Sequence, residues 1–125
     1  MNPPSLDIAK LLENAALGLA LQSNLFVSRF PESPQEVVAI YDSPSTAPDL
    51  HGYRYNGVNA QVRSIRYLDG WKLANDIGLY LHTDYGHVFE NVYYTGIWMS
   101  TDVEPIGQDE NERNLFSINF EIQRR

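Results

Sequence analysis

Leu115-Phe-Ser-Ile-Asn-Phe-Glu-Ile-Gln123 is the stretch that decides the fold class of this chain. Apolar and polar residues alternate along it, which is the period of a β-strand with one face in a core and the other in water. The sequence therefore predicts a sheet that is covered on one side only. The side chains expected to point inward are Phe116, Ile118, Phe120 and Ile122, and those expected to point outward are Ser117, Asn119, Glu121 and Gln123.

A second alternating stretch, residues 58–65, predicts another half-buried strand. We expect the polar residues of both strands to share the face away from the helices, so that Arg63 and Glu121 lie on the same side. Residues 37–41 are apolar on both faces, which favours a place inside the sheet. Further strand patterns cover residues 25–30, 88–94 and 96–99. The remaining polar residues expected on the open face are Asn59 and Gln61, and the inward residues beside them are Val58, Ala60 and Val62.

Two amphipathic helices are expected to cover the other face. The first begins after a predicted N-cap at Ser5 and ends near residues 22–24, and the second begins near Asp69. Because each helix has a single apolar face, both can pack on the same side of one sheet. The apolar faces consist of Ile8, Leu12, Ala15, Ala16 and Leu19 in the first helix, and of Trp71, Ala74, Ile77 and Leu81 in the second.

The order of these elements is α-β-β-β-α-β-β. It predicts an α+β fold with a mixed or mostly antiparallel sheet of four to five strands and two helices packed on one face. A length of 125 residues fits one domain spanning residues 1–125. Hydrophobic residues make up 43% of the chain and aromatic residues 12%, which is enough to form a core.

Charge and composition exclude several classes of partner. The formal charge is −7 and the main basic cluster is Arg124-Arg125, so tight binding to the outside of nucleic acid is not expected. The chain has no cysteine, which rules out disulfides and thiolate metal sites. Its longest apolar stretch, residues 15–21, is far shorter than a membrane span, and we expect no membrane contact.

Two groups of residues were weighed as catalytic or metal sites. His82, Asp84 and His87 form an H-x-D-x-x-H string, but this spacing alone is weak and a solvated turn is the preferred interpretation. The Asp49-His51 pair has no nucleophile motif beside it. No phosphate-binding glycine motif is present. The sequence therefore predicts a protein that is not an enzyme and that uses no cofactor or metal.

Two polar segments are candidates for contact surfaces, and the alternative for each is an ordinary exposed loop. A long loop is expected over residues 43–57, and loops of this length in compact domains are often functional. It contains tyrosine and arginine, which are enriched in interfaces. A charge run lies in a second expected loop, residues 102–114, where a solvated loop is the favoured interpretation and a partner-binding loop is the alternative. The predicted interface residues are Asp49, His51, Tyr53, Arg54, Tyr55, Asp109, Glu110 and Glu112.

Several short motifs follow one another in the order and spacing of a known family. They are Asn24-Leu-Phe-Val-Ser-Arg29, Pro31-Glu-Ser-Pro34, Val38-Ala-Ile-Tyr-Asp42, Val58-Asn-Ala-Gln-Val-Arg63, Tyr94-Thr-Gly-Ile-Trp98, Gly107-Gln-Asp-Glu-Asn111 and Phe116-Ser-Ile-Asn-Phe120. Through them nearly the whole chain resembles the siphophage tail terminator family, small proteins often labelled minor capsid proteins. One departure is the second helix, residues 68–82, which is shorter and less charged than is usual in the family.

The resemblance implies a structural virion protein that is assembled in the host cytoplasm. Such a protein forms a ring, expected to be a hexamer, that caps the head-proximal end of the tail tube and ends its polymerisation. Its partners would be other copies of itself, the major tail tube protein and the head connector or completion protein, while DNA passes through the channel without specific binding. The alternatives are a head–tail adaptor or tail-completion protein and, less favoured, a small metal-dependent hydrolase.

Overall fold

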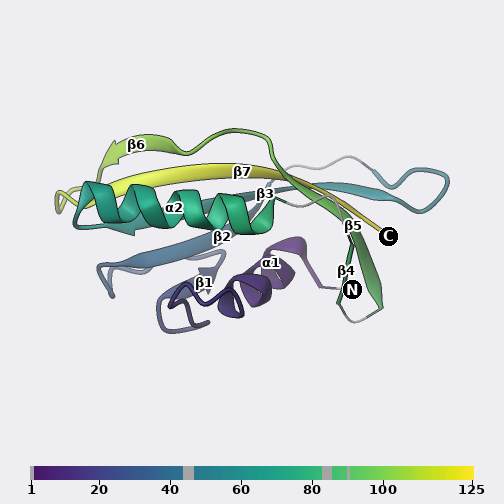
Figure 1. Cartoon of the computed structure of the whole chain (residues 1–125), viewed down its shortest axis with the longest axis horizontal. Helices are drawn as coiled ribbons and strands as arrows, with labels where there is room; N and C mark the ends of the chain where they lie inside the picture. Colours follow the sequence, from purple (N-terminus) through teal and green to yellow (C-terminus); the bar gives the residue numbers. More distant parts are fainter. Residues whose placement is uncertain (1, 44–46, 83–85, 90) are drawn as a thin grey trace.

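The computed structural model describes residues 2–43, 47–82, 86–89 and 91–125, with only the backbone described at His87 and Phe89. Two helices and a twisted sheet form an elongated molecule (Figure 1). In chain order, the elements are α1 (Pro4–Glu13), β1 (Leu25–Val27), β2 (Val37–Ser43), β3 (Arg54–Ser64), α2 (Tyr67–Leu81), β4 (His87–Phe89), β5 (Val92–Met99), β6 (Glu104–Gln108) and β7 (Asn114–Arg124).

The sheet is mixed and has β7 at its centre. The strand order is β1-β2-β3-β7-β5-β4, and β6 also pairs with β7. Strands β1 and β2 are parallel, and every other pairing is antiparallel. Along one edge β7 pairs with the whole of β3, while β5 and β6 share its other edge. The predicted α+β class with a mixed sheet is confirmed.

The described residues form a sheet of seven strands, more than the four to five that were expected. The strand missed outright is β6, which lies inside the segment predicted to be a polar loop. All five of its residues are exposed, so it has no inward-facing side chain to produce an alternating pattern. Its pairing with β7 is a backbone interaction, which leaves little trace in the sequence.

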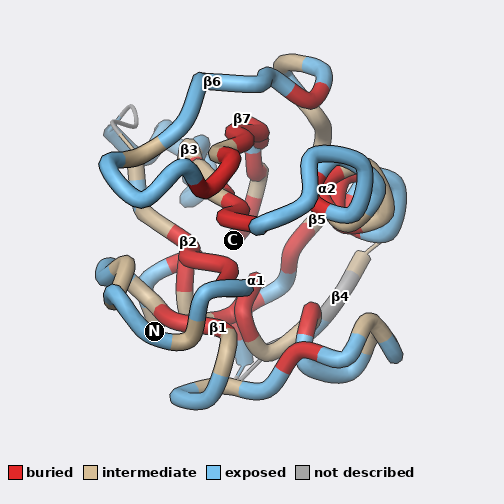
Figure 2. Tube along the Cα trace, turned by 90° about the vertical axis from the view of Figure 1, so that its left-hand side faces the viewer, coloured by how far each residue is buried: buried red, intermediate tan, exposed pale blue. Residues whose placement is uncertain are grey.

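Both helices cover one face of the sheet, as expected. Helix α1 packs against β1 and β2, and α2 packs against β3, β5 and β7. Figure 2 shows buried segments on the central strands and on the sides of the helices that face them. The predicted inward side chains all join this core, namely Val58, Ala60, Val62, Phe116, Ile118, Phe120 and Ile122.

Helix α1 is shorter than the sequence suggested. It ends at Glu13, and the chain then takes left-handed backbone angles at Ala16 (φ 58°) and Gly18 (φ 76°), which no α-helix tolerates. Ser5 lies inside the first turn and is not the N-cap. Its backbone N–H and its hydroxyl donate to the two carboxylate oxygens of Asp42 at 3.0 and 2.6 Å, so a side chain from β2 holds the start of the helix.

Helix α2 lies close to the sheet because its inner face is built from small residues. Trp71, expected in the core, is 40% exposed, and Gly70 and Gly78 are buried with Ala74, Ile77 and Leu81. A Cβ atom added at Gly70 would meet the Phe116 ring at 2.5 Å, so only glycine fits there. The tryptophan was misplaced because the apolar period did not count glycine as an inward residue.

The open face of the sheet is polar, as predicted. The register places Arg63 opposite Leu115 and Gly57 opposite Glu121, so Arg63 and Glu121 lie on the same side. Asn59 Nδ2 donates to Ser117 Oγ at 2.7 Å and to Asn119 Oδ1 at 2.9 Å, and a ladder of amides and hydroxyls therefore ties β3 to β7.

Phe120 provides a test of the core. Its side chain is 2% exposed, and we expect Phe120→Ala to lower the free energy of unfolding by about 3–5 kcal/mol because the cavity cannot collapse fully. Urea denaturation followed by circular dichroism measures the change. The control is Tyr93→Ala, which removes an exposed aromatic ring and should change stability by less than about 0.5 kcal/mol. Equal denaturation midpoints for Phe120→Ala and the wild type would refute the packing described.

Candidate interaction surfaces

The predicted interface residues fall into two turns at opposite ends of the sheet. One turn, residues 49–53, precedes β3, and the other, residues 109–113, joins β6 to β7 (Figure 1). Since β3 and β7 are antiparallel, with Arg54 opposite Arg124 and Ser64 opposite Asn114, the starts of the two strands lie far apart. The structure therefore separates the two groups, and they form no single site.

The two turns have the same internal construction. In the first, Asp49 Oδ1 accepts the backbone N–H groups of His51 and Tyr53 at 2.9 and 3.0 Å. In the second, Asp109 Oδ1 accepts those of Asn111 and Arg113 at 2.9 and 3.0 Å. Each aspartate carboxylate is thus used to close its own turn, which makes both turns well defined.

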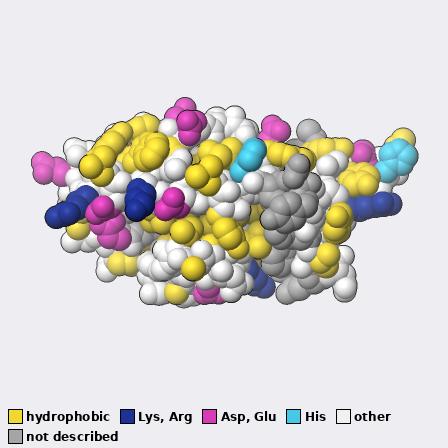
Figure 3. All heavy atoms as spheres, in the orientation of Figure 1, with side chains coloured by type: hydrophobic (Ala, Val, Ile, Leu, Met, Phe, Trp, Pro, Cys, Tyr) yellow, Lys and Arg dark blue, Asp and Glu magenta, His cyan; other side chains and the backbone are white. Residues whose placement is uncertain are grey.

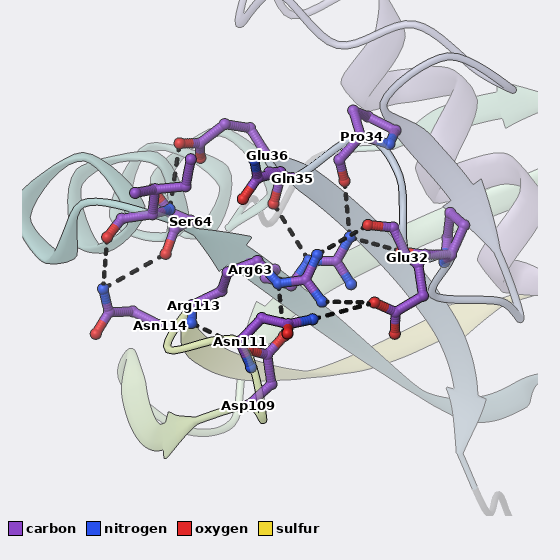
Figure 4. A network of polar contacts seen from close by, with 12 residues as sticks. Glu32, Pro34, Gln35, Glu36, Arg63, Ser64, Asp109, Asn111, Arg113 and Asn114 are labelled. Atoms are coloured by element: carbon purple, nitrogen blue, oxygen red, sulfur yellow. Dashed lines mark hydrogen bonds and ion pairs between the residues drawn. The ribbon is translucent and has the colours of Figure 1, made fainter.

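Asp109 is further held by Arg113, whose Nε donates to Asp109 Oδ2 at 2.8 Å. Desolvation raises the pKa of Asp109, but the hydrogen bonds from Arg113 and Asn111 and the guanidinium charge outweigh it and leave the pKa below its usual value. Arg113 also binds the carbonyl and carboxylate of Glu32 at 2.8 and 2.9 Å (Figure 4). This turn is consequently fixed to residues 31–36.

Two predicted loop residues belong to a strand instead. Arg54 and Tyr55 begin β3 and pair with Arg124 and Gln123 of β7, so the loop expected over residues 43–57 ends earlier. Asn-Gly is a common turn sequence, but here Asn56-Gly57 continues the strand. Glycine has a low strand propensity and adds no side chain to the alternating pattern. The backbone pairing of β3 with the long strand β7 nevertheless extends the strand through this position.

The side chains that these turns offer to a partner differ in chemistry. At the first tip Leu50 is 102% exposed and His51 is exposed, while the neighbouring Tyr53 ring lies under the Arg125 guanidinium at 5.1 Å. At the second tip Glu110 and Glu112 are exposed. One end is thus apolar and basic, and the other is acidic. Leu50 was missed because the sequence does not distinguish an exposed leucine from a buried one.

A groove on the polar face is a third candidate surface. It has a volume of about 630 Å³ and lies over the C-terminal half of β7. The Trp98 ring stands above Gly96 at one side of it, where any Cβ atom would clash with the ring at 2.2 Å. Amide, hydroxyl and aromatic groups dominate the lining, and Glu121 is its one charged residue. The lining residues are Ser43, Tyr55, Asn56, Gly57, Trp98, Ser100, Thr101, Asn119, Phe120, Glu121 and Ile122.

The C-terminal arginine pair does not form a basic patch. Arg124 is buried: its Nε donates to Asn56 Oδ1 at 2.9 Å and one Nη donates to the Asn2 carbonyl at 2.7 Å. The same Nη contacts the hydroxyl of Tyr94, which donates a short hydrogen bond to Asp7. Burial, together with the bond to Asp7, raises the pKa of Tyr94 well above its usual value. Arg124 is therefore a core residue.

The residues weighed for chemistry do not form a catalytic centre in the described part of the chain. His82 Nδ1 accepts the backbone N–H of Met99 at 3.0 Å, which ties the end of α2 to β5. Asp84 and the side chain of His87 lie outside the described residues. Among the side chains that are described, no three His, Asp or Glu residues are grouped to hold a metal ion. None of the described helices is long and apolar enough to cross a membrane.

Comparisons with known proteins give a consistent result. The family model described as bacteriophage tail terminator protein matches residues 11–125. No curated protein sequence matches the chain. A solved structure titled "Virion of native gene transfer agent (GTA) particle" contains a chain with a TM-score of 0.59 and 11% identity, covering 93% of this chain and 82% of that chain, which shows a shared fold. Because the family model spans most of its length, this chain belongs to the bacteriophage tail terminator family, whose members are structural proteins of the virion tail and not enzymes.

Proposed function

We propose that this protein caps the head-proximal end of the tail tube, ends tube polymerisation and joins the tail to the head connector. It would do so as a ring, expected to be a hexamer. A tail tube grows because each ring stacks on the previous one through two unlike surfaces, and such stacking does not end by itself. Ending it requires a protein that fits the tube at one surface and offers the next tube ring no matching surface at another. That task needs contact surfaces and no active site.

The observation that carries this proposal is the pair of aspartate-closed turns at opposite ends of the sheet. Their tips are exposed and chemically different, with Leu50 and His51 at one end and Glu110 and Glu112 at the other. A protein with two unlike, preorganised ends can bind two unlike partners. Within the ring, these turns would serve contacts with further copies, with the tail tube protein and with the connector or completion protein.

A head–tail adaptor or tail-completion protein would need similar surfaces. The distinguishing property is an effect on the tube itself. A terminator added to purified tail tube protein stops tube growth, whereas an adaptor binds the connector and leaves tube growth unchanged. This assembly assay, with tube lengths measured by electron microscopy, tests the proposed function directly.

The channel of such a ring must let DNA pass without holding it. Three of the nine Lys and Arg residues are buried, because Arg63, Arg113 and Arg124 bind groups inside the protein. Six cations remain to meet phosphates, against 16 Asp and Glu residues in each copy, whose formal charge is −7. We propose a neutral or acidic channel wall, with Glu110 and Glu112 as candidates to line it. Asp109 is less suited to this role because Arg113 already neutralises it.

The acidic tip can be tested by removing its charge. Glu110→Gln combined with Glu112→Gln should leave the denaturation midpoint unchanged, since both side chains are exposed. We expect this variant to lose tube capping, observed as tubes that keep growing in the assembly assay. The control is Asp69→Asn with Asp76→Asn on α2, which removes two charges elsewhere and should cap normally. Normal capping by the glutamate variant would show that this tip contacts no essential partner.

The channel proposal predicts weak binding to DNA. The assembled ring should bind duplex DNA no more tightly than non-specific complexes do, with a Kd above about 1 µM at physiological salt. A gel-shift titration on the assembled ring measures this affinity. Sub-micromolar binding would contradict a wall that lets the duplex slide.

A further inference from the structure

Leu50 is an unusual surface residue. It lies at the tip of the β2–β3 hairpin and is 102% exposed, so it takes no part in folding. The turn that presents it is held by the Asp49 carboxylate, by the Asp49 N–H donating to the Tyr53 carbonyl at 3.0 Å, and by the Gly52 N–H donating to the Asp49 carbonyl at 3.1 Å. An apolar side chain on a preorganised turn is a good anchor for a pocket on another molecule.

A matching hollow exists on this same chain. It lies between the C-terminal half of α2 and the link from β5 to β6, and its volume is about 360 Å³. Leu79, which is 65% exposed, and Met99 supply its apolar part. The full lining is Asn75, Leu79, Met99, Ser100, Thr101 and Asp102, and we call this hollow the α2 groove.

The charges around the tip and the groove are complementary. Next to Leu50 lie the exposed side chains of His51, Arg54 and Arg125, and the carboxylate of Asp49 is engaged by the N–H groups of its own turn. At the α2 groove Asp102 is exposed, and Glu104 follows it on β6. Figure 3 shows hydrophobic, basic and histidine side chains together at the end of the molecule that carries the hairpin. A chain of net charge −7 repels other copies unless basic and acidic regions meet in this way.

We propose that the Leu50 tip of one copy inserts into the α2 groove of the next copy, with His51 and Arg54 facing Asp102 and Glu104. This inference rests on the proposed self-assembly into a ring and names the contact between neighbouring subunits. The hairpin tip extends from the end of the sheet, whereas the groove lies beside α2 (Figure 1). Two such different surfaces make a heterologous contact, and a repeated heterologous contact closes into a ring when its rotation allows.

Disulfide trapping tests this contact cleanly because the chain has no cysteine of its own. A size-tagged Leu50→Cys variant is mixed with an Asn75→Cys variant under mild oxidation. The tip and the groove meet in our proposal, so the mixed disulfide should form about a hundredfold faster than between two free-diffusing chains. Leu50→Cys mixed with Val88→Cys, an exposed position on β4, supplies the reference rate. Equal rates in the two mixtures, in solution and in assembled tails, would overturn the proposal.

A second experiment examines the free ring without any introduced thiol. Leu50→Asp replaces the apolar contact with Leu79 and Met99 by a carboxylate that Asp102 repels, and should abolish the oligomer seen by sedimentation, while the fold stays intact because the Leu50 side chain is fully exposed. Val88→Asp is the matched control and should assemble as the wild type does. An oligomer that survives Leu50→Asp would contradict the tip-in-groove contact.

The outcomes also separate this contact from the proposed capping function. If the wild type caps tubes but the Leu50→Cys and Asn75→Cys variants cross-link no faster than the reference pair, only the contact proposed above is refuted. Conversely, rapid cross-linking by a protein that fails to cap tubes would support the contact and refute the capping role.

Discussion

The pairing of β7 with β3 is the interaction on which the rest of the structure depends. It runs along both strands from end to end and sets which residues face the helices. A slip of one residue would turn Phe116, Ile118 and Phe120 toward water and bring polar side chains under α2. Because β3 closes one edge of β7 while β5 and β6 close the other, this central strand has no free edge. The same pairing also places the two turns at opposite ends of the molecule.

Buried arginines fix the loops to this frame. Arg63 donates to the carbonyls of Pro31, Pro34 and Gln35, and its guanidinium lies 4.8 Å from the centre of the Phe30 ring. Burial lowers its pKa, and the nearby charge of Arg113 adds to this effect. Arginine side chains are mostly exposed in proteins, but three of them here are buried and hydrogen-bond to backbone carbonyls and side-chain oxygens. The burial of these three arginines therefore stabilises the loops and also removes three positive charges from the surface that could bind DNA.

The sequence predicted those features that repeat along a strand or a helix. The inward set on β7, the polar partners on β3 and the two covering helices all follow from a period. The features it missed have no period: β6 is an edge strand with every side chain exposed, and the start of β3 contains Asn56-Gly57. Trp71 was placed in the core because the inner face of α2 uses Gly70 and Gly78 in close contact with the sheet. The interface residues stay a prediction, and only the strand register shows that the two groups lie at separate ends of the sheet.

The two turns explain how one small fold can hold its shape while its contacts are set independently. In both turns an aspartate accepts two backbone N–H groups, and the residue three positions later has a left-handed backbone, at Gly52 (φ 84°) and Glu112 (φ 60°). These hydrogen bonds keep the backbone of each turn rigid whatever residue lies at its tip, because the tip side chains point into solvent. Leucine at one tip and glutamate at the other therefore affect stability little but determine which surface can dock there. A protein that must bind one partner and not another gains from this separation, because the aspartates that stabilise the turns are different residues from the tip side chains that contact a partner.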